Sequence, residues 1–242
     1  MNHAMLFAGG KISVGDHVAS TQIFGLTVDL DIVWSSLIAA AIVLGMGFWM
    51  RHKVTSGVPG KLQLAYETIV EQIKDVTDGS IGSQGDRFIP IAITLFMFIL
   101  ICNWLEILPN DGHDWVPAPT GDVNLPLACA LTVILWVHVE SVRARGVRGY
   151  LRHYGTPYKA LIPINVIEEL TKPITLTFRL FGNIFSGSLM VVVMASLLPW
   201  YGSLFGQLIW KPFDLGIGLI QAFIFALLAI LYFGMAMSTE EH

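Results

Sequence analysis

The sequence predicts an all-α membrane protein, and three observations carry this prediction. The chain has 242 residues, of which 54% are hydrophobic and only 13% charged, whereas roughly a quarter of the residues of a soluble domain are charged. Its mean hydropathy is +0.65. Five apolar stretches are long enough to cross a bilayer. The net charge of −4, with dispersed Lys and Arg residues, argues against nucleic acid as a partner.

Three of the five stretches have the length of an ordinary membrane span, which is about 20 residues. They are 32–50, 88–108 and 125–142, and each is bounded by charged residues, Pro or Gly. We therefore expect one helix over 32–50 and two more within 88–142. Residues 1–31 lack the basic flank, apolar core and cleavage site of a signal peptide, so we expect them to remain as an extracytoplasmic segment.

The last two stretches, 161–198 and 207–237, are too long for a perpendicular span. As continuous helices they would measure roughly 55 Å and 45 Å against a hydrocarbon core of about 30 Å. They must tilt steeply or break. Pro199 and Gly202 between them form a turn signal, which predicts a long, strongly tilted helix hairpin within 161–242.

Basic residues predict the orientation of the chain. Lys and Arg gather in the connections 51–87 and 143–160, so we expect both to be cytoplasmic. The connection 109–124 has acidic residues but no Lys or Arg, so we place it outside. Five spans then leave the N-terminus outside and the C-terminus in the cytoplasm.

The connection 51–87 also carries an amphipathic pattern. Apolar residues recur at helical spacing, opposite a charged face; they are Leu62, Tyr66, Ile69, Ile73 and Val76. This pattern predicts an amphipathic helix that lies on the membrane or against a partner. A short connector with one apolar face explains the pattern equally well.

Nothing in the sequence indicates a cofactor or a metal. Cys102 and Cys129 lie inside apolar stretches without the spacing of a metal site, so we interpret them as small buried hydrophobic residues. No G-x-x-x-x-G-K-[ST] phosphate-binding loop occurs. We therefore expect a chain without catalytic residues of its own for ATP chemistry.

One permanent charge, Arg179, lies in the middle of an apolar stretch. A central Arg costs roughly 2.5–3.5 kcal/mol on insertion scales, and it cannot escape by losing its proton. Because it is far from both ends of its stretch, it would reach an interface only through a strong tilt. Polar residues share its side of a continuous helix: Glu168, Lys172, Thr175, Asn183 and Ser186. With Gly182 and Gly187 nearby, this stripe predicts a surface for a partner helix.

The final stretch has a polar face of its own. Asp214, Gly218, Gln221, Phe225 and Tyr232 return to nearly the same angle on a helix. In a hairpin, Gln221 would reach the level of Arg179 and Asn183. An interhelical hydrogen bond that only holds the hairpin together explains Gln221 equally well.

These groups predict two half-paths for protons, separated by a positive barrier. Glu168 and Glu169 lie toward the cytoplasm, and Asp214 lies toward the outside. Residues near the outer mouth are Glu106, Asp111, His113, Asp122 and Asn124. A guanidinium is not a proton carrier, but it attracts a carboxylate strongly in a low dielectric. Since no carboxylate of this chain is expected opposite Arg179, the transferable acid should belong to a partner.

Several motifs resemble one family closely. The run KPITLTFRLFGNIFSG, with PIN before it and LIQAFIFALLAILY after it, looks like subunit a of the bacterial F-type ATP synthase. ICNWLEILP and GDVNLPLACAL resemble the end of the family's second helix and the start of its third. The likeness runs from about residue 62 to the C-terminus, and it implies a location in the bacterial plasma membrane.

The resemblance implies a stationary, non-catalytic subunit of a proton-transporting complex. Its partners would be a rotating ring of c subunits, the b-type subunits of the peripheral stalk, the rest of the synthase and membrane lipid. Arg179 would be the essential arginine that meets the ring carboxylates, with Asn183, Gln221 and Asp214 lining the proton path. Two positions depart from the family: Ser188 stands where many members have an acid or histidine, and Asn165 where some have glutamate.

Two other classes of protein compete with this interpretation. A channel or secondary transporter that acts alone would use the same polar stripe to line a substrate path. An intramembrane hydrolase would use Ser186 or Ser188 as nucleophile and His138 as base. The serines lack a G-x-S-x-G motif, and His138 lies near the cytoplasmic end of its span, which argues against the hydrolase.

Overall fold

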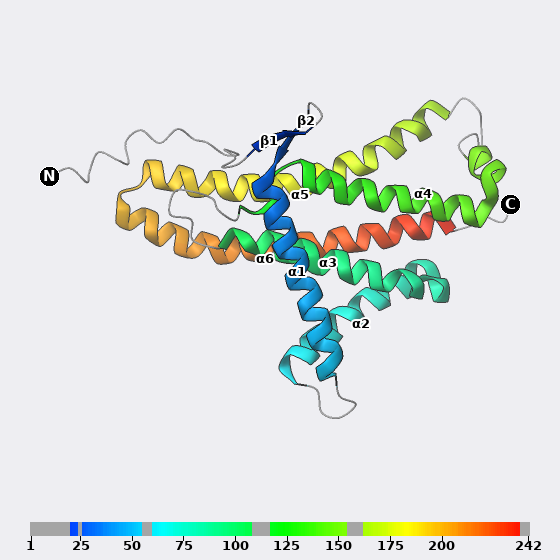
Figure 1. Ribbon diagram of the computed structural model, residues 1–242, viewed down its shortest axis with the longest axis horizontal. Helices are drawn as coiled ribbons and strands as arrows, with labels where there is room; N and C mark the ends of the chain where they lie inside the picture. Colours follow the sequence, from blue (N-terminus) through cyan, green and yellow to red (C-terminus); the bar gives the residue numbers. More distant parts are fainter. Residues whose placement is uncertain (1–19, 24–25, 55–59, 108–116, 154–161, 238–242) are drawn as a thin grey trace.

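The computed structural model confirms an all-α membrane protein. It describes residues 20–23, 26–54, 60–107, 117–153 and 162–237. Within these ranges, five helices are long and apolar enough to cross a membrane. Figure 1 shows the two C-terminal helices side by side near their connection, whereas further to the right α5 diverges from α6 and α4 runs between them. The chain is therefore an integral, multi-pass membrane protein.

The first three spans lie close to the predicted stretches. α1 covers Leu30–Lys53, α3 covers Ile89–Trp104 and α4 covers Asn124–His153. Short 3₁₀ helices precede and follow α3: η1 (Gly82–Phe88) and η2 (Leu105–Ile107). A further 3₁₀ turn, η3 (Pro119–Gly121), leads into α4.

α4 extends well past the predicted span. The segment 143–153, expected to begin a loop, is helical after a kink at Gly146, whose φ of 71° lies in the left-handed region. A residue with a side chain rarely adopts that conformation, so glycine allows the sharp change of direction. Basic residues of this segment therefore lie on a helix.

The C-terminal hairpin is formed by two unbroken helices. α5 covers Ile162–Leu197 and α6 covers Trp200–Met237. Pro173 and Pro212 lie inside these helices without ending them. The prediction that the second helix begins near residue 207 was wrong: it begins at Trp200, and only Leu198 and Pro199 separate the two helices. Gly202 therefore belongs to α6 and not to the turn.

The amphipathic segment forms α2, Lys61–Ile81. It packs against α3 and α6 of the same chain. Ile73 is fully buried, and Tyr66 and Ile69 pack on the core, whereas Glu67 and Lys74 are exposed. The apolar face of this helix therefore stabilises the bundle itself.

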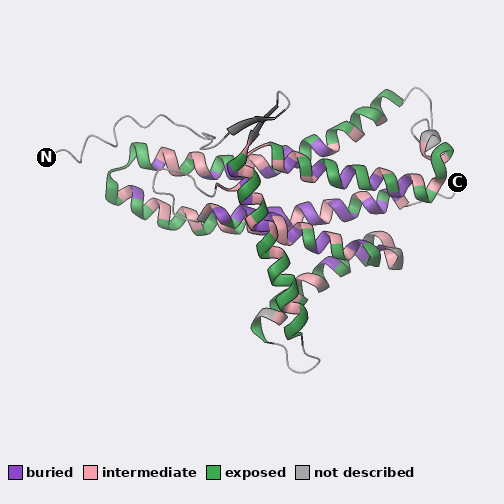
Figure 2. Ribbon diagram, in the orientation of Figure 1, coloured by how far each residue is buried: buried purple, intermediate pink, exposed green. Residues whose placement is uncertain are grey.

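The centre of the bundle lies where α3, α4 and α6 meet (Figure 2). Phe88 at the end of η1 stacks on Phe233 of α6 with ring centroids 4.2 Å apart. Ala222, Ala226 and Ala229 of α6 are buried, and their small side chains allow neighbouring helices to approach closely. α6 is thus the central helix of the core, while α5 remains mostly exposed on its far side.

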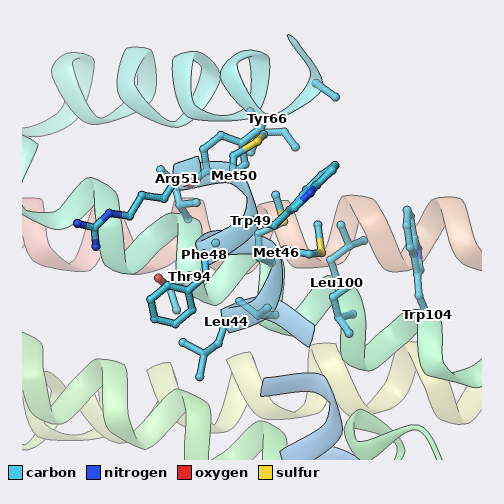
Figure 3. A pocket seen from close by; sticks show the side chains of 17 residues that line it. Leu44, Met46, Phe48, Trp49, Met50, Arg51, Tyr66, Thr94, Leu100 and Trp104 are labelled. Carbon is cyan, nitrogen blue, oxygen red and sulfur yellow. The ribbon is translucent and has the colours of Figure 1, made fainter. Parts of the chain in front are cut away.

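α1 is the least buried span, and it runs across α3. Between α1, α2 and α3 lies a cavity of about 480 Å³. Its walls include Met46, Trp49, Tyr66 and Trp104 (Figure 3). The lining is almost wholly apolar, so this space differs in kind from the polar sites described below.

A short antiparallel ribbon precedes α1 and was not predicted. β1 (Ser20–Ile23) pairs with β2 (Leu26–Asp29), with Ser20 opposite Asp29. The ribbon leads directly into α1, where the Ser35 hydroxyl donates to the Asp31 carbonyl. It lies outside the helical core and leaves the all-α class unchanged.

Replacement of Phe233 by alanine should destabilise the bundle. Removal of a fully buried Phe side chain costs typically 3–5 kcal/mol, because the cavity is only partly refilled. We expect the detergent-solubilised protein to aggregate at a lower temperature, measured by heating followed by size-exclusion chromatography. Phe205→Ala is the matched control, since Phe205 is on the same helix and 65% exposed; an equal loss in both variants would contradict the prediction.

Candidate functional site

The structure brings four polar side chains together where η2 meets the α5–α6 hairpin. The Ser188 hydroxyl of α5 donates to Glu106 Oε1 over 3.0 Å. Lys211 Nζ of α6 lies 3.7 Å from the same oxygen and donates to the Glu106 carbonyl over 3.2 Å. The Glu106 and Asp214 carboxyl groups also hydrogen-bond to each other. We call Glu106, Ser188, Lys211 and Asp214 the outer cluster.

A glycine creates the space that Asp214 occupies. Asp214 is only 8% exposed, and a Cβ added at Gly187 would lie 2.5–2.8 Å from its carboxyl atoms. The Trp210 indole donates to the Gly187 carbonyl over 3.3 Å, which fixes the register of the two helices here. Gly187 therefore faces α6 of its own chain.

A buried amide ties α3 to α6 beside the outer cluster. Asn103 Nδ2 donates to the Gly218 carbonyl over 3.0 Å, and its Oδ1 accepts from the Thr120 hydroxyl over 2.8 Å. A Cβ on Gly218 would approach the Asn103 Cβ to 3.2 Å. The glycine thus permits close packing of α6 on α3.

Arg179 lies on the exposed side of α5, together with Thr175, Phe178 and Ser186. The Thr175 and Ser186 hydroxyls donate to carbonyls of their own helix. Among the described residues, no carboxylate forms an ion pair with Arg179. The guanidinium acts electrostatically on the Tyr232 phenol of α6. Thr175, Arg179 and Ser186 of the polar stripe therefore face away from the core of this chain.

Gln221 lies at the depth of Arg179 but on a buried face. Since Trp210 contacts Gly187, antiparallel counting places Gln221 opposite residue 176, roughly 5 Å along the axis from Arg179. Gln221 is 7% exposed. Its Nε2 and the Asn183 Nδ2 are buried without a hydrogen-bond partner among the described residues. The two amides therefore share a level with Arg179 without any recorded contact to it.

A second polar group joins α4 to α5 near the other end of the hairpin. Lys172 Nζ lies 2.6 Å from Glu169 Oε1, and His138 Nε2 lies 3.9 Å from Glu169 Oε2. His138 Nδ1 is 3.3 Å from the Tyr150 hydroxyl. Glu168 is exposed on the surface of α5. Glu169 is therefore held by two neighbouring side chains of this chain, whereas Glu168 faces outward.

The remaining predicted mouth residues lie at the start of α4. Asp122 Oδ1 accepts from the backbone nitrogen of Asn124 over 2.6 Å, and Asn124 is exposed. Asp111 and His113 fall outside the described residues.

The arrangement does not support a hydrolase. The described partners of His138 are Tyr150 and Glu169. Ser188 donates to Glu106 and Ser186 to its own helix. A serine nucleophile requires a base within hydrogen-bonding reach, and no described histidine is so placed.

Comparison with known proteins identifies the family. The family model described as ATP synthase A chain matches residues 33–234. The chain belongs to the ATP synthase subunit a family. It is 48% identical over 233 residues to ATP synthase subunit a of Acidothermus cellulolyticus, covering 96% of this chain and 85% of the relative. The Mycobacterium leprae protein of that name is 44% identical over 247 residues, or 98% of each chain. That of Vibrio vulnificus is 34% identical over 233 residues, or 89% and 86% of the two chains.

Membership in this family makes the chain a component of the membrane sector of the F-type ATP synthase, a complex of ATP synthesis and proton transport.

Sequence reasoning alone missed two features of the outer cluster. Lys211 was not singled out, although it stands three residues before Asp214 and so on a neighbouring helical face. Ser188 was noted as a departure from the family and as a nucleophile of the competing hydrolase interpretation, whereas the structure makes it a donor to Glu106.

Replacement of Gly187 by alanine should disturb Asp214. The added methyl group has no room beside the buried carboxyl group, and such overpacking costs typically 1–3 kcal/mol. We expect at least tenfold lower passive proton conductance in vesicles carrying the membrane sector. The matched control is Gly216→Ala, because a Cβ at Gly216 meets nothing within 4 Å. Normal conductance in the Gly187 variant would show that Asp214 tolerates displacement.

Proposed function

We propose that this subunit a is the stationary proton conductor of the membrane sector, with two offset half-paths separated by Arg179. The observation that carries this proposal is an exposed guanidinium on a membrane-spanning helix that has no ion-pair partner among the described residues. A charge that cannot be removed must be compensated in the membrane. A carboxylate of a neighbouring subunit, passing along the exposed side of α5, would supply that compensation.

The outer cluster supports an entry half-path. Its two carboxyl groups are hydrogen-bonded and largely buried, and buried titratable groups of this kind in membrane proteins mark proton relays. From Asp214, the path would continue past Gln221 and Asn183, whose amide nitrogens have no hydrogen-bond partner among the described residues and so suit contact with water. Asp122 and Asn124 would lie at the outer mouth. The entry path would thus end beside the Arg179 surface.

The opposite end of the hairpin supports an exit half-path. Glu168 is exposed on α5, and Glu169 is held by Lys172 and His138. These acids would receive protons on the cytoplasmic side, together with Thr175 of the polar stripe, whereas Ser186 follows Arg179 on α5 and would belong to the entry side. This assignment places the basic connections and the C-terminus in the cytoplasm and the N-terminus outside.

Arg179 would couple proton movement to rotation. A partner carboxyl group must be neutral to face lipid, and the nearby guanidinium makes its ionised form acceptable. Each carboxyl group of a c ring would therefore lose its proton only at this surface and regain one from the other half-path. The membrane potential, worth roughly 2.3 kcal/mol per charge per 100 mV, would bias the direction. The b-type stalk subunits would hold this chain still.

Replacement of Arg179 by alanine or glutamine should abolish ATP-driven proton pumping in the assembled complex. Without this guanidinium, an ionised partner carboxylate loses its counter-charge at this level of α5, because Lys172 lies about two turns away and is paired with Glu169, and the two half-paths are no longer separated. Pumping is measured by dye quenching in inverted vesicles. Arg148→Gln, on an exposed position of α4, is the matched control. Normal pumping by the Arg179 variants would reject the proposal, and pumping or transport by this chain reconstituted alone would favour an independent transporter.

Replacement of Asp214 by asparagine should slow proton entry. The amide keeps the shape of the side chain but removes its ability to hold and release a proton. We expect passive proton conductance to fall at least tenfold after the soluble sector is removed. Asp86→Asn, at an exposed position, serves as control. Unchanged conductance would remove Asp214 from the path without affecting the role of Arg179.

A further inference from the structure

The outer cluster contains an amine whose role the proposed path leaves open. Lys211 Nζ lies 3.7 Å from a carboxyl oxygen of Glu106 and donates to the backbone carbonyl of the same residue. The Lys211 side chain is 34% exposed, and that of Glu106 is 13% exposed. The amine therefore reaches from the edge of the cluster toward its buried acids.

A count of charges shows what this amine does to the acid pair. The Glu106 and Asp214 carboxyl groups interact directly, and repulsion between two such close negative charges favours a proton on one of them. The pair with one proton carries one negative charge, and the ammonium group balances it. Because net charge is costly in a low dielectric, the cluster favours the state with one shared proton. Without the ammonium group, it would be neutral only with two protons.

The described groups around the pair leave Lys211 as its source of positive charge. η2 contributes Glu106, and α6 contributes Lys211 and Asp214. α5 contributes the Ser188 hydroxyl, which donates to Glu106. α3 contributes the uncharged amide of Asn103, which reaches Gly218 one turn further along α6. Asp111, His113 and Asp114 follow η2 in the sequence and lie outside the described residues.

We infer that Lys211 is a positioning residue of the entry half-path, which holds Glu106 against Asp214 and keeps the acid pair at one proton. A pair that holds one proton beside an empty acceptor site takes up a proton from outside and releases one inward. A pair saturated with two protons at working pH releases them poorly. This inference rests on the proposed function of the outer cluster. It adds that Lys211 sets the number of protons bound by Glu106 and Asp214.

The hydrogen bond from Lys211 to the Glu106 carbonyl also ties α6 to η2. A purely structural role would depend on this hydrogen bond and not on the charge of Lys211. Three substitutions separate charge from hydrogen bonding. Lys211→Arg keeps the charge and the donor, Lys211→Gln keeps a donor without charge, and Lys211→Met keeps neither. Each variant is expressed in the complete ATP synthase, and co-purification of the ring subunits checks its assembly.

The measurement is passive proton conductance against external pH in vesicles from which the soluble sector has been removed. Loss of an opposite charge within about 4–6 Å strengthens proton binding by one to three pH units. The Gln and Met variants should therefore move the midpoint of the profile to higher pH by about one to three units. Their maximal conductance should also fall, because proton release inward becomes slower. The Arg variant should keep the original midpoint.

A Gln variant with the original profile would overturn the inference, because hydrogen bonding alone would then suffice. If neither uncharged variant assembles with the ring while the Arg variant does, Lys211 is a structural residue and the inference also falls. The Arg179→Ala variant distinguishes failure of the inference about Lys211 from failure of the proposed function. If it stops pumping while the Lys211 variants keep their pH profile, only the role of Lys211 fails; if it pumps normally, the proposed function fails first.

Discussion

A guanidinium in a membrane-spanning helix is the constraint on which the arrangement of this chain depends. Arg179 cannot be neutralised by losing its proton, and it lies on the exposed side of α5, away from the core formed by α3, α4 and α6. In the proposed function, a carboxylate of a neighbouring subunit compensates this permanent charge. The side of α5 that carries Arg179 stays open to a neighbour because α6, whose small and apolar residues form the core, packs only on the opposite side of α5.

The acids of the chain are separated from this charge by the geometry of the hairpin. Asp214 of α6 lies beside Glu106 of η2 at one depth in the membrane. Glu169 and Lys172 of α5 pair with each other at a different depth. Arg179 lies between these levels along α5. Within a single chain the cation thus has polar groups toward each end but no described carboxylate as an ion-pair partner. This spacing is what a path interrupted by a positive barrier requires.

Close packing at glycine allows titratable groups to be buried in the hairpin. Gly187 gives Asp214 its space, and Gly218 brings the Asn103 amide onto the backbone of α6. The same small residues that let membrane helices approach each other therefore also bring polar groups of different helices together. In this way close packing at glycine both stabilises the hairpin and assembles the polar groups of the proposed proton path.

The sequence by itself determined the membrane class, the five long apolar helices, the hairpin and the isolation of Arg179, because hydrophobic length, helical periodicity and a permanent charge are local properties. Tertiary structure alone decided that Glu106 meets Ser188, Lys211 and Asp214, since Glu106 is about 80 to 110 positions away from these three residues in the sequence. It also decided that Gln221 faces the core while Arg179 faces outward. Helical periodicity gives the angle of a residue on its own helix, but only packing between helices fixes what that angle faces.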